Sequence, residues 1–414
     1  MDAEAQFAIL SSGTEEILPE GALLERLRLA AREKRPLRVK QGFDPTAPDI
    51  HLGHTVGLRK LRQFQELGHQ VVLIVGDCTG LVGDPSGRSK TRPQLGEAEV
   101  EANARTYLDQ FYRVIERTPR PPLLPVEVHR NGEWFAAMRF IDVLRLMSQY
   151  TVARLLERDD FAKRHAAHQP IGVHELLYPL MQGYDSVAIR ADVELGATEQ
   201  KFNLLVGRVL QEQHGQPPQI ALTLPVLPGL DGVQRMSKSL ANYIGVTDPP
   251  GEMFGKVMSL PDGVMPLFWR LTTDATPAEL AEVLAALNDG RTNPMVVKKR
   301  LGRALVAMYH GAPAAERAQA DFEAQFARGE APESLATWAA PDASEIGIKD
   351  LLVQAGLAKS GSDAWRAVDQ GAVSVDGEKI TDRAHRQRLG RTFVLRLGRR
   401  MIRVRPAGEP GGKG

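Results

Sequence analysis

Apolar residues follow two different spacings along the first 226 residues, and their alternation predicts an α/β fold. The continuous β-branched run at 70–76 predicts a strand that is buried on both faces of a parallel sheet. Along 51–67 the apolar residues recur at helical spacing, which predicts a helix that stops at Gly68. A strand, a helix and a strand in that order begin a right-handed crossover unit. Further core strands are expected at 37–39, 124–128, 186–193 and 219–226.

The rest of the chain predicts a run of helices and then a small mixed module. The segment 329–345 is rich in Pro, Ala and Ser, which is typical of a linker. Two helices are expected after it, one at 348–357 and one that runs from a capping Ser362 to Gln370. A short strand at 373–375 then leads into Asp376-Gly377, a turn signal typical of a β-hairpin.

Length and composition limit the classes of protein that this chain can be. A chain of 414 residues is too long for one core and predicts two or three domains. With 43% hydrophobic and 25% charged residues it has the composition of a globular protein, and its single cysteine excludes a disulfide framework. The first residues hold neither a basic region nor a long apolar segment, so no secretory leader is expected, and no apolar run is long enough to cross a bilayer. We therefore expect a cytoplasmic protein with no membrane partner.

The net charge of +1 conceals a difference between the two ends of the chain. Residues 346–414 hold 14 Lys and Arg against 7 Asp and Glu, a charge of +7, which leaves −6 for the remainder. A basic segment on an acidic body suggests an anionic partner, most simply a nucleic acid. A solvated basic face is the common alternative.

The most informative stretch is KQGFDPTAPDIHLGH, which begins at Lys40 and ends at His54. It predicts a strand, a turn broken by two prolines, and the entrance of a helix. His51 and His54 fall at that entrance, where free N–H groups and the helix dipole attract phosphate, and Gly53 between them permits close approach. Alone, these four letters are as consistent with a helix cap at His54 and a surface residue at His51.

A second motif favours the phosphate-binding interpretation of HLGH, namely Arg235-Met236-Ser237-Lys238-Ser239. Together, HLGH and RMSKS resemble the two signatures of the class I aminoacyl-tRNA synthetases. The longer passages GFDPTAPDIHLGH and GLVGDPSGRSKTRP are similar to the bacterial tyrosyl-tRNA synthetases, and the resemblance covers nearly the whole chain. It implies that L-tyrosine and ATP form tyrosyl-adenylate and pyrophosphate, and that the tyrosyl group then passes to the terminal ribose of tRNA(Tyr). It also implies ATP with magnesium as a substrate, no tightly bound cofactor, and a homodimer.

The resemblance assigns roles to residues that match the family's motifs. The residues implied in catalysis are His51, His54, Thr46, Lys238 and Arg235. Those implied in ATP binding are Gly53, Glu199, Arg88, Arg92, Met236, Ser237 and Ser239.

A polar face of one helix is the predicted amino-acid pocket. Tyr178, Gln182 and Asp185 lie at i, i+4 and i+7, so they share one face and can converge on a small polar ligand. A solvated polar face is the commoner outcome of such spacing. The family uses the matching tyrosine and glutamine for the substrate ammonium and the aspartate for the phenol. Other residues implied in substrate binding are Asp84, Asn131, Gln200 and Asp44, with a helix or turn cap as the alternative for Asn131.

Four positions depart from the family pattern. Ala197 replaces a glycine and Glu199 an aspartate, while Arg235 replaces a lysine and donates as a rigid fork instead of a point charge. Lys40 stands where many members have a tyrosine that makes a second phenol contact.

The implied domains follow the family. A Rossmann-like catalytic domain is expected at 1–240 with a dimer-forming insertion around 125–180. A helical anticodon-stem domain at 241–330 and a linker at 331–345 precede an α+β RNA-binding module at 346–408, which resembles one in a small-subunit ribosomal protein and in pseudouridine synthases, and a flexible tail at 409–414. The basic residues expected to meet RNA phosphates are Lys349, Arg366, Lys379, Arg386, Arg388, Arg396 and Arg400.

Three alternatives remain open at this stage. A tryptophanyl-tRNA synthetase shares the sheet and both signatures, but the basic C-terminal module and the Tyr178/Gln182/Asp185 face argue against it. A catalytically dead synthetase-like RNA-binding protein conflicts with intact HLGH and RMSKS motifs. A small-molecule nucleotidyltransferase that uses only HxGH would leave the C-terminal module without a purpose.

Overall fold

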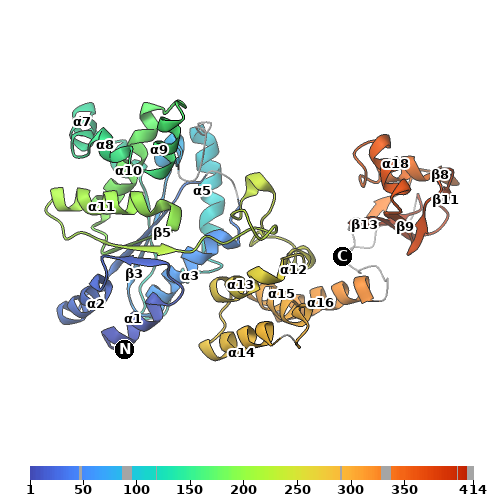
Figure 1. Ribbon diagram of the computed structural model, residues 1–414, viewed down its shortest axis with the longest axis horizontal. Coiled ribbons are helices and arrows are strands. Elements are labelled where there is room, and N and C mark those ends of the chain that lie inside the picture. Colours follow the sequence, from blue (N-terminus) through green and yellow to red (C-terminus); the bar gives the residue numbers. More distant parts are fainter. Residues whose placement is uncertain are drawn as a thin grey trace. The chain divides into compact units, whose positions relative to one another are not determined.

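The computed structural model describes residues 1–45, 49–85, 96–117, 119–289, 291–327, 337–398 and 400–407. The chain forms two compact units (Figure 1). The first consists of Met1–Asp248 and Lys256–Leu301, and the second of Pro249–Gly255 and Gly302–Gly414. The helices expected at 241–330 are therefore divided between the two units, and the domain boundaries expected from the sequence stay a prediction.

A six-stranded sheet forms the centre of the first unit, with the strand order β1-β6-β5-β2-β3-β4. The five strands β2 to β6 run parallel to their neighbours, and β1 closes one edge antiparallel to β6. The strands are β1 (Glu16–Leu18), β2 (Arg38–Phe43), β3 (Gln70–Val75), β4 (Glu127–Arg130), β5 (Val193–Ala197) and β6 (Ile220–Leu224). The predicted parallel α/β sheet is confirmed, while the short strand β1 was not expected.

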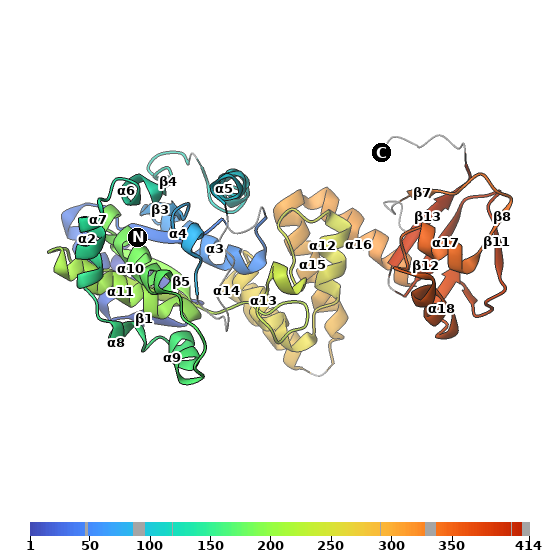
Figure 2. The same ribbon diagram turned by 90° about the horizontal axis from the view of Figure 1, so that it is seen from above.

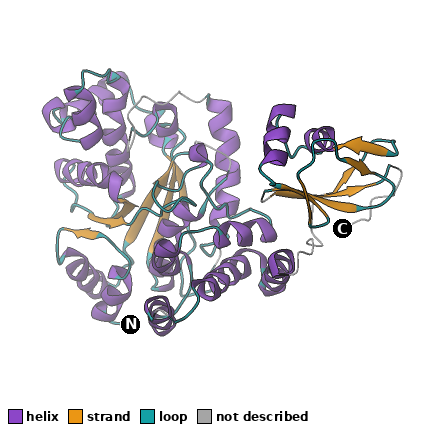
Figure 3. Ribbon diagram, turned by 45° about the vertical axis from the view of Figure 1, so that its right-hand side comes forward, coloured by secondary structure: helices purple, strands orange, loops and turns teal. Residues whose placement is uncertain are grey.

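The strand order reverses beside β2. The chain proceeds from β2 to β3 and β4 on one side, and it returns to place β5 and β6 on the other. In open parallel sheets such a reversal leaves a crevice at the carboxyl ends of the strands, where ligands bind. All six residues of β3 are buried, since helices lie on both sides of the sheet (Figure 3).

Most of the helices of the first unit precede or follow these strands. The longest include α3 (Leu52–Glu66), α5 (Glu97–Phe111), α10 (Val173–Ile189) and α11 (Lys201–Gln213). The others are α1 (Ala3–Ser11), α2 (Ala22–Glu33), α4 (Thr79–Val82), α6 (Gly132–Phe135), α7 (Phe140–Ser148), α8 (Val152–Leu155), α9 (Asp159–Ala166), α13 (Met265–Thr272) and α14 (Pro277–Asn288).

The strand expected at 186–193 is wrong in its first half. Helix α10 continues to Ile189 and ends where Arg190 adopts a left-handed conformation with φ of 53°. Val187 packs with apolar residues of α7 and α11, and Ile189 packs with β3. The apolar residues that suggested alternation are thus two buried positions of a helix, and β5 begins only at Val193.

The second unit contains α16 (Ala312–Ala327), most of α12 (Pro250–Met258) and α15 (Pro294–His310), and a C-terminal module (Figure 2). The module has a five-stranded sheet, β10-β9-β12-β13-β7, and a two-stranded ladder, β11-β8. Its helices are α17 (Ile348–Gln354) and α18 (Gly361–Asp369). Its strands are β7 (Thr337–Ala339), β8 (Glu345–Gly347), β9 (Val373–Val375), β10 (Glu378–Ile380), β11 (Arg386–Arg388), β12 (Phe393–Leu397) and β13 (Arg400–Arg405).

Three local expectations for this module can be compared with the structure. The hairpin at Asp376-Gly377 is confirmed, since both residues have positive φ and join β9 to β10. The helix cap is Ser360, whose hydroxyl accepts from the Asp363 amide, and not Ser362. Part of the predicted linker is ordered, because β7 pairs in parallel with β13.

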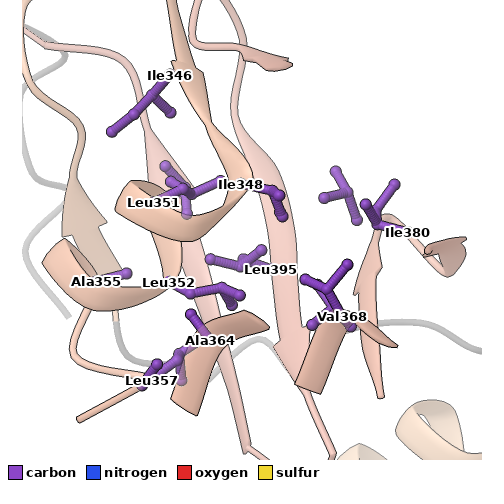
Figure 4. Packing of buried hydrophobic residues seen from close by; sticks show 14 of the residues in the cluster. Ile346, Ile348, Leu351, Leu352, Ala355, Leu357, Ala364, Val368, Ile380 and Leu395 are labelled. Atoms are coloured by element: carbon purple, nitrogen blue, oxygen red, sulfur yellow. The ribbon is translucent and has the colours of Figure 1, made fainter. Parts of the chain in front are cut away.

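The module has a hydrophobic core of its own, formed by α17, α18 and the sheet (Figure 4). Leu395 of β12 is fully buried there, with Leu351, Leu352 and Val368 in the same cluster. We expect Leu395→Ala to lower the unfolding free energy of the module by about 2–5 kcal/mol, because it removes buried methyl groups and leaves a cavity. Hydrogen exchange of the amides in 346–405 measures this change.

The matched control is Val353→Ala on α17, where the side chain is 36% exposed. The Val353→Ala substitution should alter the unfolding free energy of the module by no more than about 0.5 kcal/mol. Equal losses in the two variants would contradict the assignment of Leu395 to the core.

Candidate functional site

A pocket of about 490 Å³ opens at the carboxyl ends of the parallel strands of the first unit. Asp44 follows β2, Gly76 follows β3 and Ala197 ends β5, and all three line the pocket. Helices α3 and α10 add the predicted histidines and the predicted polar face. The pocket therefore lies in the crevice that the reversal of strand order creates.

Asp185 is a buried residue that lines the pocket. Its side chain is 3% exposed and accepts hydrogen bonds from Trp134 Nε1 at 3.0 Å and from Asn131 Nδ2 at 3.4 Å. Burial raises the pKa of Asp185 to about 7, and the Lys40 ammonium and the two donors act in the opposite direction. Asn131 is the N-cap residue of α6, but its side chain makes no capping bond there and instead accepts from the backbone N–H of Cys78 at 2.9 Å, so it supports the pocket.

Tyr178 and Gln182 join Asp185 in the pocket, so the predicted shared face of α10 is confirmed and a solvated face is excluded. The Tyr178 hydroxyl donates to Asp44 Oδ2 at 2.8 Å, while the Thr79 hydroxyl donates to Asp44 Oδ1 at 2.7 Å. Both polar atoms of the Gln182 side-chain amide form hydrogen bonds. Its Nε2 donates to a carboxylate oxygen of Glu194 at 3.1 Å, and its Oε1 accepts from an Asn203 side chain at 2.8 Å.

Lys40 lies behind this face and is fully buried. Its Nζ is 2.9 Å from Glu194 Oε1, and it donates to the Gln182 carbonyl and to the Ser186 hydroxyl at 2.8 Å each. The residue at the position of the family's second phenol contact is therefore one half of a buried ion pair.

The two histidines form the entrance of α3. His51 is the N-cap residue, and its backbone N–H donates to His54 Nδ1 at 3.2 Å. The rings are tilted by 35° with centroids 3.9 Å apart, and His51 is only 8% exposed, so it is not a surface residue. Burial lowers the pKa of both imidazoles, that of His54 to about 4, so both rings are neutral at pH 7. A side chain at Gly53 would meet the His51 ring at 3.0 Å.

The RMSKS motif lines the same pocket. Lys238 Nζ donates to the Asp49 carbonyl, and burial lowers its pKa to about 8. Arg235 Nη1 lies 2.5 Å from Glu199 Oε1, so two of the departures from the family pattern face one another. Met236 is buried, and Ser237 and Ser239 share a hydrogen bond of 2.9 Å.

Asp84 also lines the pocket, but an arginine already neutralises it. Arg158 Nη2 lies 3.4 Å from Asp84 Oδ1, and the same guanidinium holds Asp160 at 2.9 Å. Gln200 accepts from the Ala197 amide at 3.1 Å and faces the pocket. The remaining predicted site residues, Thr46, Arg88 and Arg92, lie outside the described residues.

Several residues that complete the site were not predicted from the sequence. Trp134 gives the shorter of the two bonds to Asp185, and Thr79 links Asp44 to Asn131. The spacing of Asn131 and Trp134, three residues apart, was the available signal. The role of Glu194 had no local signal, because its partners come from other elements.

The basic residues expected to bind RNA are distributed over the C-terminal module. Five of them are exposed, namely Arg366, Lys379, Arg386, Arg388 and Arg400. Lys349 and Arg396 are half-buried. Arg386 is paired with Glu345 at 2.7 Å.

Two features are absent from the described part of the chain. It holds no group of three or more His, Cys, Asp or Glu side chains arranged to bind a metal ion. None of its helices is both long and apolar enough to cross a bilayer.

Comparison with protein families gives two matches. Residues 32–327 match the family of class I tRNA synthetases (W and Y), and residues 331–401 match the tyrosine–tRNA ligase SYY-like C-terminal domain. The tyrosine–tRNA ligase of Moorella thermoacetica is 50% identical over 95% of this chain and 94% of its own length. That of Geobacter sulfurreducens is 47% identical over 97% of this chain and 98% of its own length.

Solved structures give the same fold. A truncated mitochondrial tyrosyl-tRNA synthetase from Aspergillus nidulans has a TM-score of 0.64 and 19% identity, covering 78% of this chain and 94% of its own. The tyrosyl-tRNA synthetase of Archaeoglobus fulgidus, complexed with L-tyrosine, has a TM-score of 0.61 and 23% identity, covering 77% of this chain and all of its own.

The buried imidazole of His54 predicts a pH dependence of stability. Its pKa is about 4 in the folded chain against an ordinary value of 6.5, so the unfolded chain binds the proton first as pH falls. Stability should therefore be lost between about pH 6.5 and 4. His54→Asn keeps an acceptor for the His51 amide and should reduce the slope of unfolding free energy by up to about 1.4 kcal/mol per pH unit. Denaturant titrations at several pH values measure that slope, and an unchanged slope would contradict the burial of a neutral His54.

Proposed function

Because the chain belongs to the class I tRNA synthetases, and within them to the tyrosine–tRNA ligases, we propose that its pocket joins L-tyrosine to ATP and that the tyrosyl group then passes to tRNA(Tyr). The observation that carries this proposal is Asp185. It is a buried carboxylate that lines the pocket, held by two donors, and it can accept a third hydrogen bond from a phenol. A phenol is what distinguishes tyrosine from phenylalanine.

Other residues that line the pocket suit the amino group of the substrate. Asp44 and Asp84 supply carboxylates, and Tyr178 and Gln182 supply oriented polar groups beside them. We assign the substrate ammonium to this region, with Gln200 at its border. Asn131 acts indirectly, since it holds Asp185 and the turn after β3.

The triphosphate is proposed to lie at the entrance of α3. Free N–H groups at a helix start favour anions, and neutral imidazoles at His51 and His54 can donate hydrogen bonds without a proton change. Lys238 and Arg235 add positive charge from the RMSKS motif, with Met236, Ser237 and Ser239 shaping it, and Gly53 allows close approach. Magnesium is proposed to arrive with ATP as the counter-ion of its phosphates.

Glu199 is the proposed partner of the ATP ribose. Its carboxylate now pairs with Arg235, so nucleotide binding would exchange this ion pair for ribose hydroxyls and free the guanidinium for phosphate. Thr46, Arg88 and Arg92 are proposed to contact phosphates on the strength of their motifs alone.

The chemistry needs no nucleophilic side chain. An oxygen of the tyrosine carboxylate attacks the α-phosphorus, the bond to the bridging oxygen breaks, and pyrophosphate leaves. A hydroxyl of the terminal ribose of the tRNA then attacks the carbonyl carbon, and AMP leaves. The enzyme's part is to align two anions and to stabilise charge that develops on the phosphates.

The C-terminal module is proposed to bind the tRNA. Its exposed arginines and lysines offer phosphate contacts, which supply affinity more than sequence choice. We place the protein in the cytoplasm, where tRNA is charged for translation.

Tyrosine-dependent ATP–pyrophosphate exchange tests the proposed reaction. The wild type should exchange with tyrosine and not with phenylalanine or tryptophan. Asp185→Ala removes the acceptor of the phenol, and a hydrogen bond to a charged group is worth about 1.5–3 kcal/mol, so the preference for tyrosine over phenylalanine should fall roughly ten- to hundredfold. Exchange with tryptophan would overturn the substrate, and loss of exchange with all three amino acids would favour the RNA-binding alternative.

A homodimer is proposed from one face of α7. Phe140 is 77% exposed, and Ile141, Leu144 and Met147 are 45%, 42% and 37% exposed. These residues lie on one side of the helix, and contiguous exposed apolar residues mark an interaction surface. A second copy of the chain is the partner that the family implies.

Leu144→Glu tests this surface. A carboxylate placed in an apolar interface loses its hydration without a partner, so the variant should sediment as a monomer at micromolar concentration. Val296→Glu is the control, because Val296 is 53% exposed on α15, and it should leave the sedimentation coefficient unchanged. A wild type that is itself monomeric would refute the homodimer.

A further inference from the structure

The ion pair of Lys40 and Glu194 spans the two strands between which the strand order reverses. The residues are direct partners in the register of β2 and β5, both side chains are 0% exposed, and their charged atoms lie 2.9 Å apart. A buried ion pair gains little net stability, and well-packed apolar residues of similar volume often serve equally well. Stability alone therefore does not account for this pair.

The pair is bonded to the turn of α10 that carries the pocket. Lys40 Nζ donates to the Gln182 carbonyl and to the Ser186 hydroxyl. Glu194 accepts from the Gln182 side chain at 3.1 Å and from the Ser186 hydroxyl at 3.1 Å. Since Gln182 and Ser186 flank Asp185 in one helical turn, the pair fixes the segment from which Asp185 points into the pocket.

The charges around Asp185 come from several elements. Lys40 on β2 is a cation that favours its ionised form, and Glu194 on β5 disfavours it. After β3, Asp77 and the Cys78 thiol add further acidic groups, and Asp77 accepts from the Cys78 amide at 2.9 Å. Asp44 at the end of β2 reaches the same cluster through its bond to Thr79, whose hydroxyl accepts from Asn131.

We propose that Lys40 is a specificity-determining positioning residue, which keeps Asp185 as an anionic acceptor for the phenol of the substrate while Glu194 limits its effect. The proposal rests on the function proposed above. An ionised Asp185 accepts the phenol hydrogen in a charge-assisted bond. When phenylalanine occupies the pocket, the same anion stays buried without that donor, which disfavours binding. Lys40 thus acts on substrate choice through Asp185, although it stands where the family has a direct phenol contact.

The test compares Lys40→Met and Glu194→Gln, two exchanges that conserve size and remove opposite charges. Tyrosine kcat/KM from pyrophosphate exchange is measured between pH 6 and 9.5, together with the ratio for tyrosine over phenylalanine. Loss of the Lys40 cation raises the pKa of Asp185. The acid limb of the pH profile, where kcat/KM falls as Asp185 becomes protonated, should therefore move to higher pH in Lys40→Met. Since the pKa of Asp185 is about 7 in the wild type, a shift of about one pH unit would lower tyrosine kcat/KM at pH 7 by roughly fivefold, and the loss should recover at pH 9. In Glu194→Gln the limb should move to lower pH.

Opposite shifts are the decisive result, because a purely structural defect would impair both variants without moving the limb in two directions. If one of the single variants does not fold, the double variant Lys40→Met/Glu194→Gln is used instead, because it removes both charges and leaves neither of them unpaired. It should still show the alkaline shift, since the influence of Lys40 on Asp185 exceeds that of Glu194.

Glu175→Gln is the matched control. Glu175 forms a buried ion pair with Arg164 at 2.6 Å on the first turn of the same helix, away from the pocket, so its loss should leave the acid limb in place. If the acid limbs of Lys40→Met and Glu194→Gln coincide with that of the wild type, the inference is overturned. Tyrosine-dependent exchange in the wild type would still support the proposed function. Absence of tyrosine-dependent exchange in the wild type would overturn the function itself.

Discussion

The reversal of strand order between β2 and β5 is the constraint on which the rest of the site depends. After these two neighbouring parallel strands the chain continues to opposite sides of the sheet. This leaves a crevice at the carboxyl ends of the strands. Asp44 then stands at one wall of the opening and Glu199 at another, although 155 residues of sequence separate the two positions. Strand register thus decides which side chains meet.

Burial has opposite consequences for the histidines and for the aspartate that line the pocket. At the entrance of α3, the imidazoles of His51 and His54 are kept neutral by burial, so they can donate to an anion without titrating near pH 7. On α10, burial acts on Asp185 in the direction that would remove its charge, and Lys40 opposes this. The same physical effect, desolvation, therefore supports one function and has to be countered for the other.

Much of this arrangement was predictable from local pattern. The helix entrance at His51, the buried strand β3 and the shared face of Tyr178, Gln182 and Asp185 follow from spacing alone, and the structure confirms them. The extension of α10 to Ile189 was not predictable, because short apolar runs fit a strand and a buried helix equally well. The partner of Lys40 could not be predicted either, since a cross-strand pair depends on a register that forms between segments more than 150 residues apart.

Asp185 by itself contributes less to stability at neutral pH than in acid, which is opposite to the effect of His54. Its pKa is about 7 in the folded chain against an ordinary 3.8, so its contribution to stability is complete below about pH 4 and is lost as pH rises through 7. A phenol that donates to the carboxylate compensates for the solvation that burial removed. Ligand binding and stability are therefore linked through one ionised group, and tyrosine should stabilise the chain more strongly than phenylalanine does. The negative charge of Asp185 lowers the stability of the chain when the pocket is empty, and the same charge selects the substrate.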